Sequence, residues 1–143
     1  MEIPSFNFLA ILVAGLVIFA LGGLWYSPVL FAKRWIALQG RTEEQMRADA
    51  ARANMPLMYA SVLICGLLTA FVLDLLIVHL DPHVAMTPFH GALLGFFCWL
   101  GFAATTSYGT SLFSMRPRAL WLIDSTYNLV SFVLAGIILA AWR

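Results

Sequence analysis

The sequence of 143 residues has few charged side chains: only 10% are Asp, Glu, Lys or Arg, whereas 62% are hydrophobic. A soluble domain usually carries about a quarter charged residues, so this scarcity excludes an ordinary water-soluble domain. The net charge of +1 also lacks the basic excess of a nucleic-acid-binding protein, so no nucleic acid is expected as a partner. We therefore expect an integral membrane protein whose main surroundings are the lipid bilayer.

Cysteine is also scarce, and its spacing gives no metal-ligating motif. Cys65 and Cys98 fall within different apolar runs, where two thiols are typical packing residues rather than a disulfide framework. The sequence lacks a nucleophile elbow, a phosphate-binding loop, a zinc motif and a C-x-x-C pair. We therefore expect a protein that is not an enzyme and needs no metal or cofactor.

Proline is absent from the interior of every long apolar run. Residues 6–26, 55–80, 87–112 and 120–142 form four such runs, each long enough to span a bilayer, which needs roughly 20 apolar residues. Because backbone groups in lipid must be paired within the segment, each run is predicted to be a helix. Pro56 and Pro88 suit first helical turns, with Thr87 as an N-cap. We therefore predict four uninterrupted spans, unlike the broken helices of many transporters.

Basic residues are missing from residues 81–88, which join the second and third runs, and seven of the eight lie in the other two connections. Cytoplasmic loops of membrane proteins carry an excess of Lys and Arg. This distribution predicts that residues 27–54 and 113–119 are cytoplasmic and that both the N-terminus and the C-terminus lie outside. The seven residues are Lys33, Arg34, Arg41, Arg47 and Arg52 in the first connection, and Arg116 and Arg118 in the third.

The first connection is long enough to hold structure of its own. Ser27-Pro28 reads as a cap followed by a first-turn proline, which predicts a helix to Gln39, with Gly40 as its stop. Apolar residues recur along this helix at helical spacing, as expected of a helix that lies in the membrane interface. These residues are Phe31, Trp35 and Leu38.

A second, polar helix is predicted to follow at the cytoplasmic surface. It begins at Thr42, which forms a capping-box pattern with Gln45, and continues to about residue 53. Glu43 and Arg47 are spaced for an i, i+4 ion pair. The predicted fold is thus all-α: an integral membrane four-helix bundle, one membrane domain over residues 1–143, with a cytoplasmic interfacial helix pair between spans 1 and 2.

Residues 23–35 carry the most distinctive pattern, Gly-Leu-Trp-Tyr-Ser-Pro-Val-Leu-Phe-Ala-Lys-Arg-Trp. This W-Y-S-P-x-x-F-x-x-x-W element resembles the signature of a family of small bacterial membrane proteins, the DUF1761 family, and residues 99–105 and 128–142 are similar to it as well. The resemblance implies a four-span protein of the bacterial inner membrane and supplies no activity or catalytic residue. The signature residues, interpreted as interfacial, are Trp25, Tyr26, Ser27, Pro28, Phe31 and Trp35.

Only two acidic residues fall inside the predicted spans, and an ionisable residue in hydrocarbon is a functional hypothesis by default. Asp124 shares one helical face with Asn128 and Ser131, and Thr105 and Thr106 of the third span lie at matching depth. Ser107, Gly22 and Gly23 fall at the same level. Two readings stay open: a site for a proton, ion or substrate, or interhelical hydrogen bonds that hold the bundle together.

The second intramembrane acid, Asp74, lies toward the outer side and too far from Asp124 to share a proton. There it can reach the interface, cap a neighbour or mediate self-association. His79, His83 and His90 fall around the outer loop, where they form either a metal or haem site or a set of polar interfacial side chains. No ligand spacing repeats among them, which favours the interfacial reading and no metal.

Two further features concern packing and ligands. Gly91 and Gly95 form a G-x-x-x-G pattern that allows close helix approach, either to another span of this chain or to a second copy. Trp99 falls near mid-membrane, where its indole N–H needs a partner or lines a ligand cavity.

The sequence favours a noncatalytic membrane protein that acts through protein or lipid contacts, as a homo-oligomer or as an accessory or scaffold subunit of a membrane-protein partner. The alternative is a small transporter or channel with a polar site at Asp124 and Asn128. A further alternative is a binder of lipid or quinone that uses Trp99 and neighbouring aromatic residues.

Overall fold

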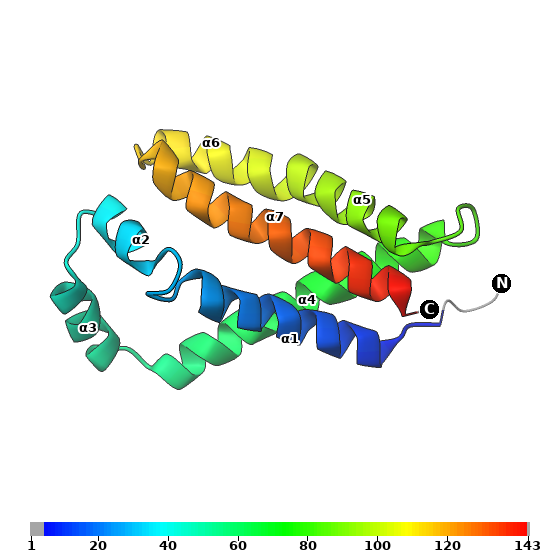
Figure 1. Cartoon of the computed structure of the whole chain (residues 1–143), viewed down its shortest axis with the longest axis horizontal. Coiled ribbons are helices and arrows are strands. Elements are labelled where there is room, and N and C mark those ends of the chain that lie inside the picture. Colours follow the sequence, from blue (N-terminus) through cyan, green and yellow to red (C-terminus); the bar gives the residue numbers. More distant parts are fainter. Residues whose placement is uncertain (1–4, 143) are drawn as a thin grey trace.

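A computed structural model describes residues 5–142, and the described chain consists of helices joined by turns and loops, with no strand in that range (Figure 1). Four of its helical segments are long and apolar enough to cross a membrane. This confirms the all-α, four-span fold. In chain order the elements are α1 (Phe8–Trp25), α2 (Ala32–Leu38), α3 (Glu43–Arg52), α4 (Met55–Leu80), α5 (Pro88–Cys98), the π-helical turn η1 (Trp99–Ala104), α6 (Thr105–Phe113) and α7 (Arg118–Ala141).

The span ends lie within two residues of the predicted ones, and three of the four spans begin at a polar cap. Asn7 and Asn54 accept hydrogen bonds from the backbone N–H of the third residue along, at the starts of α1 and α4. The Thr87 hydroxyl accepts from the His90 N–H at 3.3 Å, which confirms it as the N-cap of α5. Pro56 and Pro88 lie in first turns as predicted, where a missing N–H costs no hydrogen bond.

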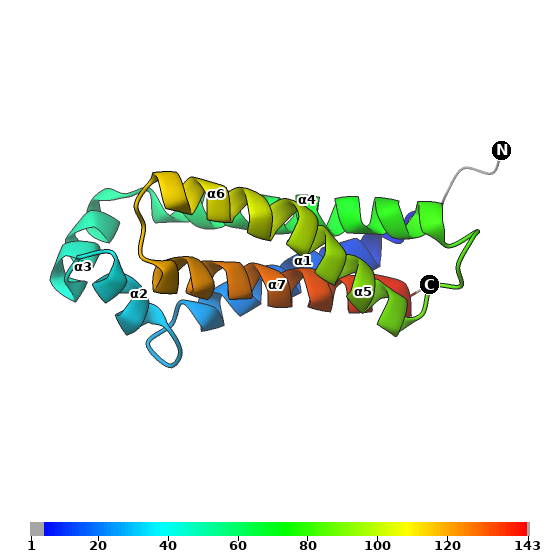
Figure 2. The same cartoon turned by 90° about the horizontal axis from the view of Figure 1, so that it is seen from above.

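The third span is not the uninterrupted helix that the sequence predicted. Between α5 and α6 the chain forms the π-helical turn η1. A π turn inserts an extra residue into the helical repeat and shifts the direction of the helix that follows. Figure 2 shows the result: α5 crosses close to α7, whereas α6 runs apart from it. No proline marks this bend, so the proline pattern did not predict it.

Helix α7 is the centre of the bundle, with α1, α4 and α5 packed against it. The closest approach is between α5 and α7, where a Cβ added at Gly91 would collide with the carbonyl oxygen of Gly136. One added at Gly95 would collide with the carbonyl oxygen of Phe132. The G-x-x-x-G face is therefore occupied by a helix of the same chain, which is one of the two predicted alternatives.

The molecule has two distinct ends (Figure 1). At one end, here called the terminal end, α1 begins, α7 finishes and the loop between α4 and α5 lies; the Asn7 side-chain amide donates to the Trp142 carbonyl oxygen there at 2.7 Å. At the other, the helix-pair end, lie α2, α3 and the turn between α6 and α7. The basic connections therefore share one end of the molecule.

Helix α2 begins later than predicted. Residues 27–31 form turns rather than a helical start at Pro28, and the helix begins at Ala32 after Phe31. The Ser27 hydroxyl does not cap the helix that follows, because it donates to the carbonyl oxygen of Leu24 in α1 at 2.7 Å. Gly40 ends the segment as predicted, with a positive φ of 69° that a side chain would strain.

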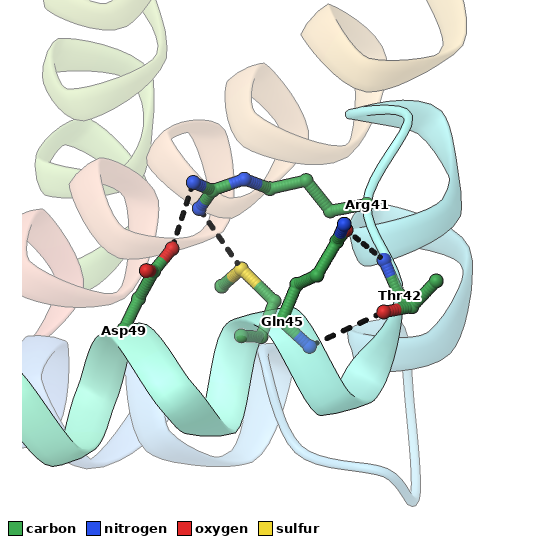
Figure 3. Close-up of polar contacts among 5 residues, drawn as sticks. Arg41, Thr42, Gln45 and Asp49 are labelled. Atoms are coloured by element: carbon green, nitrogen blue, oxygen red, sulfur yellow. Dashed lines mark hydrogen bonds and ion pairs between the residues drawn. The ribbon is translucent and has the colours of Figure 1, made fainter.

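Helix α3 begins with the predicted capping box (Figure 3). The Gln45 N–H donates to the Thr42 hydroxyl at 3.2 Å, and the Thr42 N–H donates to the Gln45 side-chain oxygen at 3.0 Å. The predicted ion pair of Glu43 with Arg47 does not form. The ion pair of this helix instead joins Arg41 to Asp49 at 2.7 Å, because the turn after Gly40 carries Arg41 back over α3.

Candidate functional site

Asp124, the predicted polar centre, is hydrogen-bonded to the signature segment. Its Oδ1 atom accepts from the Tyr26 hydroxyl at 2.8 Å and from the Trp35 indole N–H at 3.0 Å. Tyr26 follows α1 directly and Trp35 lies on α2, so one carboxylate oxygen joins two elements to α7. This is the interhelical hydrogen bonding that was one of the two readings of Asp124.

The other signature residues complete the same contact. The Trp25 indole N–H donates to the Ile123 carbonyl oxygen at 3.1 Å, and its ring lies 4.9 Å from the Phe31 ring. The Tyr26 and Trp35 rings meet edge to face at 5.4 Å. We call this set the signature joint: Trp25, Tyr26, Phe31 and Trp35 against Ile123 and Asp124 of α7. Ser27 and Pro28 form the turn that lets the chain fold back.

The electrostatics of the joint favour a neutral phenol as the donor. Burial, together with the hydrogen bond to Asp124, raises the pKa of Tyr26, which lies just beyond the last residue of α1. A protonated phenol donates to a carboxylate, whereas a phenolate would repel it. The raised pKa of Tyr26 therefore favours the protonated phenol that donates to Asp124.

A polar pocket lies beside the joint, between α6 and α7. Its volume is about 330 Å³, near the lower end of the range for small-molecule sites. Every residue that lines it has a polar group, from hydroxyls and an amide to two opposite charges. We call it the α6–α7 pocket; its lining residues are Thr106, Ser107, Thr110, Ser111, Arg116, Trp121, Asp124, Ser125 and Asn128.

The hydroxyl of Ser125, on α7, is buried in this pocket without a partner in the described part of the protein. Ser125 is only 3% exposed, and its Oγ makes no hydrogen bond to any described residue. A buried hydroxyl without a partner costs about 1–3 kcal/mol, so such a group normally meets water or a ligand. On α6, the hydroxyls of Thr106, Ser107 and Thr110 donate to carbonyl oxygens of the preceding turn.

The π-helical turn explains why the pocket exists. Trp99 is the first residue of this turn. Its indole N–H donates to the Ser125 carbonyl oxygen at 2.9 Å and holds the α5 half of the span against α7. Beyond the turn α6 diverges, and Trp121 of α7 still contacts it: the Trp121 indole N–H donates to the Ser107 hydroxyl at 3.0 Å, and its ring lies 4.8 Å from the Tyr108 ring. Because α6 diverges from α7 and carries hydroxyl side chains, a polar space remains between the two helices.

The predicted inner cluster is only partly assembled. Asp124, Asn128, Thr106 and Ser107 line the α6–α7 pocket. Thr105 does not line it, and its hydroxyl donates to the Gly101 carbonyl oxygen at 2.7 Å. Three other predicted members also lie elsewhere: Ser131 is buried deeper along α7, and Gly22 and Gly23 line a separate groove beside α1.

The predicted outer residues do not come together in one site. Asp74 is fully buried, with 0% of its surface exposed, so it does not reach the interface as one prediction held. His79 and His83 are exposed, and the His90 imidazole is hydrogen-bonded to the Thr87 hydroxyl at 3.0 Å. Among the described residues, no group of three His, Cys, Asp or Glu side chains has metal-binding geometry.

The groove beside α1 is the largest of the described cavities, about 810 Å³, and three tyrosines contribute to its lining: Tyr26, Tyr59 and Tyr127. Trp99, which was predicted either to find a partner for its indole N–H within the bundle or to line a ligand cavity, does not line this groove. Its indole is used in the contact with Ser125. Cys65 is exposed and Cys98 buried, and both are free thiols, so no disulfide crosses the bundle.

Sequence reasoning missed five of the nine residues that line the α6–α7 pocket. Arg116 was assigned only a role in orientation, and Thr110, Ser111, Trp121 and Ser125 were not singled out. The available signal was the hydroxyl content of residues 105–111, which is high for a span. Regular helical spacing could not show which of these hydroxyls face α7, because the π turn rotates α6 relative to α5.

The fold and this site define a small four-span integral membrane protein with a polar pocket between two of its helices. A family model described as "Protein of unknown function (DUF1761)" matches residues 9–140, nearly the whole chain. The protein belongs to this family, as the signature indicated. No curated protein and no solved structure matches the chain.

Proposed function

We propose that the protein is a noncatalytic membrane protein that acts as a homo-oligomer. The supporting observation is α3, a helix that is ordered but buries none of its residues against its own chain. The capping box and the Arg41–Asp49 ion pair stabilise it without any core contact (Figure 3). A folded polar helix that is held out from the bundle suits contact with a second chain.

The charges of α3 are arranged for pairing with a second copy. Glu43 and Glu44 occupy its first turn, and Arg47 and Arg52 lie toward its C-terminal end. None of these four takes part in an ion pair with another described residue. When two copies of α3 lie antiparallel across a two-fold axis, the acidic part of one faces the basic part of the other, and the several alanines of α3 permit close approach.

The signature joint supports this proposal because it fixes the direction of the helix pair. Trp35 anchors α2 to Asp124 of α7, and α2 leads directly into α3. An arm that is fixed relative to the membrane loses less conformational entropy when it binds than a flexible one does. The family signature then serves to present α3.

We further propose that the protein lies in the bacterial inner membrane with the helix-pair end in the cytoplasm. All seven basic residues of the two connections lie at that end, and the basic-free loop lies at the terminal end with both termini (Figure 1). A cysteine introduced in α3 of a Cys65→Ser, Cys98→Ser chain should resist a membrane-impermeant maleimide applied to intact cells. One introduced at His83 should react, and the reverse pattern would refute the orientation.

Two charge variants of the full chain in lipid nanodiscs test the dimer. Glu43→Lys with Glu44→Lys makes α3 wholly basic at the proposed contact, and Arg47→Glu with Arg52→Glu makes it wholly acidic. We expect the unaltered protein to be dimeric by mass measurement, each variant alone to be monomeric, and an equal mixture of the two to form heterodimers. A monomeric unaltered protein, or variants that dimerise alone, would refute the proposal.

The α6–α7 pocket favours a second candidate, a small transporter or channel built from several copies with Asp124 and Asn128 at its polar centre. Solute flux into liposomes is the test. Under this candidate, Asp124→Asn and Asn128→Ala abolish flux in protein that remains folded.

A further inference from the structure

We infer that the α6–α7 pocket binds a zwitterionic group, a phosphate joined to a primary ammonium, as in the headgroup of phosphatidylethanolamine. The inference concerns binding only, so it does not depend on α3 pairing or on transport. The argument starts from two opposite charges in one small pocket. Arg116 stands on the turn before α7, and Asp124 lies nearly two helical turns into α7.

These two charges line the same cavity without neutralising each other. No nitrogen of Arg116 lies within 4.0 Å of an Asp124 oxygen. The Arg116 guanidinium makes no hydrogen bond or ion pair with any described residue. Asp124 uses Oδ1 for the signature joint, and Oδ2 accepts no hydrogen bond from the described chain. One donor group and one acceptor atom thus remain for a ligand.

The pairing of charges selects the ligand class. A simple anion would meet Arg116 but be repelled by Asp124, and a simple cation would suffer the reverse. A molecule that carries both charges satisfies both residues at once. The neutral groups between them, the buried Ser125 hydroxyl and the Asn128 amide, provide hydrogen-bonding partners for the polar atoms that link the two charges.

Ser125 is the strongest sign that something occupies the pocket. Its hydroxyl is nine-tenths buried or more, lines the cavity and has no partner in the described chain. A helix that gained nothing from this hydroxyl would be more stable with alanine at the same position. The unsatisfied group is therefore explained by a polar ligand atom.

The rim of the pocket lies where a lipid headgroup would lie. Phe113 and Met115, in the turn just before Arg116, are 94% and 93% exposed. In a bilayer, apolar side chains this exposed at the end of a span would contact the acyl chains, and this depth would set Arg116 near the lipid phosphates. The turn is well defined: Met115 has φ 52°, and the Arg116 N–H donates to the Ser111 carbonyl oxygen at 3.1 Å.

The first experiment compares three lipids that share a phosphate. The purified full chain in mild detergent is titrated with short-chain phosphatidylethanolamine, phosphatidylcholine and phosphatidylglycerol, and bound lipid is counted by native mass spectrometry. Choline has no N–H to donate to Asp124, and glycerol has no cation. We expect phosphatidylethanolamine to bind at least tenfold more tightly than the other two; equal binding of all three, or no binding, overturns the inference.

Variants then locate the site. Arg116→Gln should weaken binding about tenfold, while Arg118→Gln, an exposed arginine two residues on that does not line the pocket, should leave it unchanged. Asp124→Asn keeps an acceptor for the signature joint but should abolish the preference for ethanolamine over glycerol. If the Arg116→Gln and Arg118→Gln variants lost lipid affinity equally, surface charge alone would explain the binding, and this result would overturn the inference.

Ser125→Ala separates ligand binding from folding. Because the hydroxyl has no partner in the described chain, this variant should be at least as stable as the unaltered protein without lipid but should bind the lipid more weakly. Unchanged affinity would contradict the role given to Ser125. Free phosphoethanolamine identifies the source of the group: competition with the lipid means that the headgroup alone suffices, and lipid binding without competition means that the acyl chains are needed as well.

Discussion

The two halves of the third span meet α7 in opposite ways. In α5, Gly91 and Gly95 have no side chains, so backbone touches backbone and no space remains. In α6, a Cβ added at Gly109 would meet nothing within 4 Å, and hydroxyl side chains border a cavity of about 330 Å³. The π-helical turn between the halves marks the change. One span thus combines a tightly packed half, which holds the fold, with an open polar half that has room for a ligand.

The largest effect should come from filling the packed half. Gly91→Ala places a methyl against the Gly136 carbonyl oxygen and the Ala140 side chain, so we expect the free energy of unfolding to fall by about 3 kcal/mol. The matched control in the open half is Gly109→Ala, which should leave stability unchanged or raise it by up to about 1 kcal/mol. Denaturant unfolding in detergent, followed by tryptophan fluorescence, measures both. Equal losses would show that the two halves pack alike.

A smaller effect should follow when Asp124 loses its acceptor. Asp124→Leu leaves the Tyr26 hydroxyl and the Trp35 indole N–H without a partner, and we expect a loss of about 2 kcal/mol in the free energy of unfolding. Asp124→Asn keeps a carbonyl oxygen at the same place and should lose less than half as much. If both variants are equally destabilised, the charge of Asp124, and not its hydrogen bonds, holds the joint.

The smallest effect on stability should come from Trp35→Phe, which keeps a ring against Tyr26 but removes one hydrogen bond, worth about 1 kcal/mol. Its clearer result is local: amide hydrogen exchange in α2 and α3 should accelerate because the joint no longer fixes the arm. Trp142→Phe at the terminal end is the control and should leave exchange in α2 and α3 unchanged. Unchanged amide exchange in Trp35→Phe would show that the signature joint does not hold α3 in place.

Local chemistry made much of the fold predictable. Pro88 with Thr87 set the start of α5, and Thr42 with Gln45 set the start of α3, since caps act between residues a few positions apart. Ser27-Pro28 misled for the same reason: the pair suits a helix start, but here the chain must fold back so that Trp35 reaches Asp124. A tertiary contact outweighed the local preference.

The candidate site was predictable only in part. Asp124, Asn128 and Thr106 were found because polar residues are rare in spans and helical spacing groups them. Arg116 and Ser125 were not, since their place in the pocket depends on the divergence of α6 after Trp99. For Asp74, depth along the span left contact with the interface as one of three alternatives, and packing of the bundle buries the side chain completely.

By itself, the sequence determined the membrane class, the four spans and the ends of those spans, because apolar length and capping are properties of adjacent residues. The tertiary structure alone decided that Tyr26 and Trp35, 98 and 89 residues from Asp124, would share one carboxylate oxygen. It also decided that the third span would bend at Trp99 and open a polar pocket. Both outcomes depend on how separate helices pack around α7, and no local pattern in the chain specifies that packing.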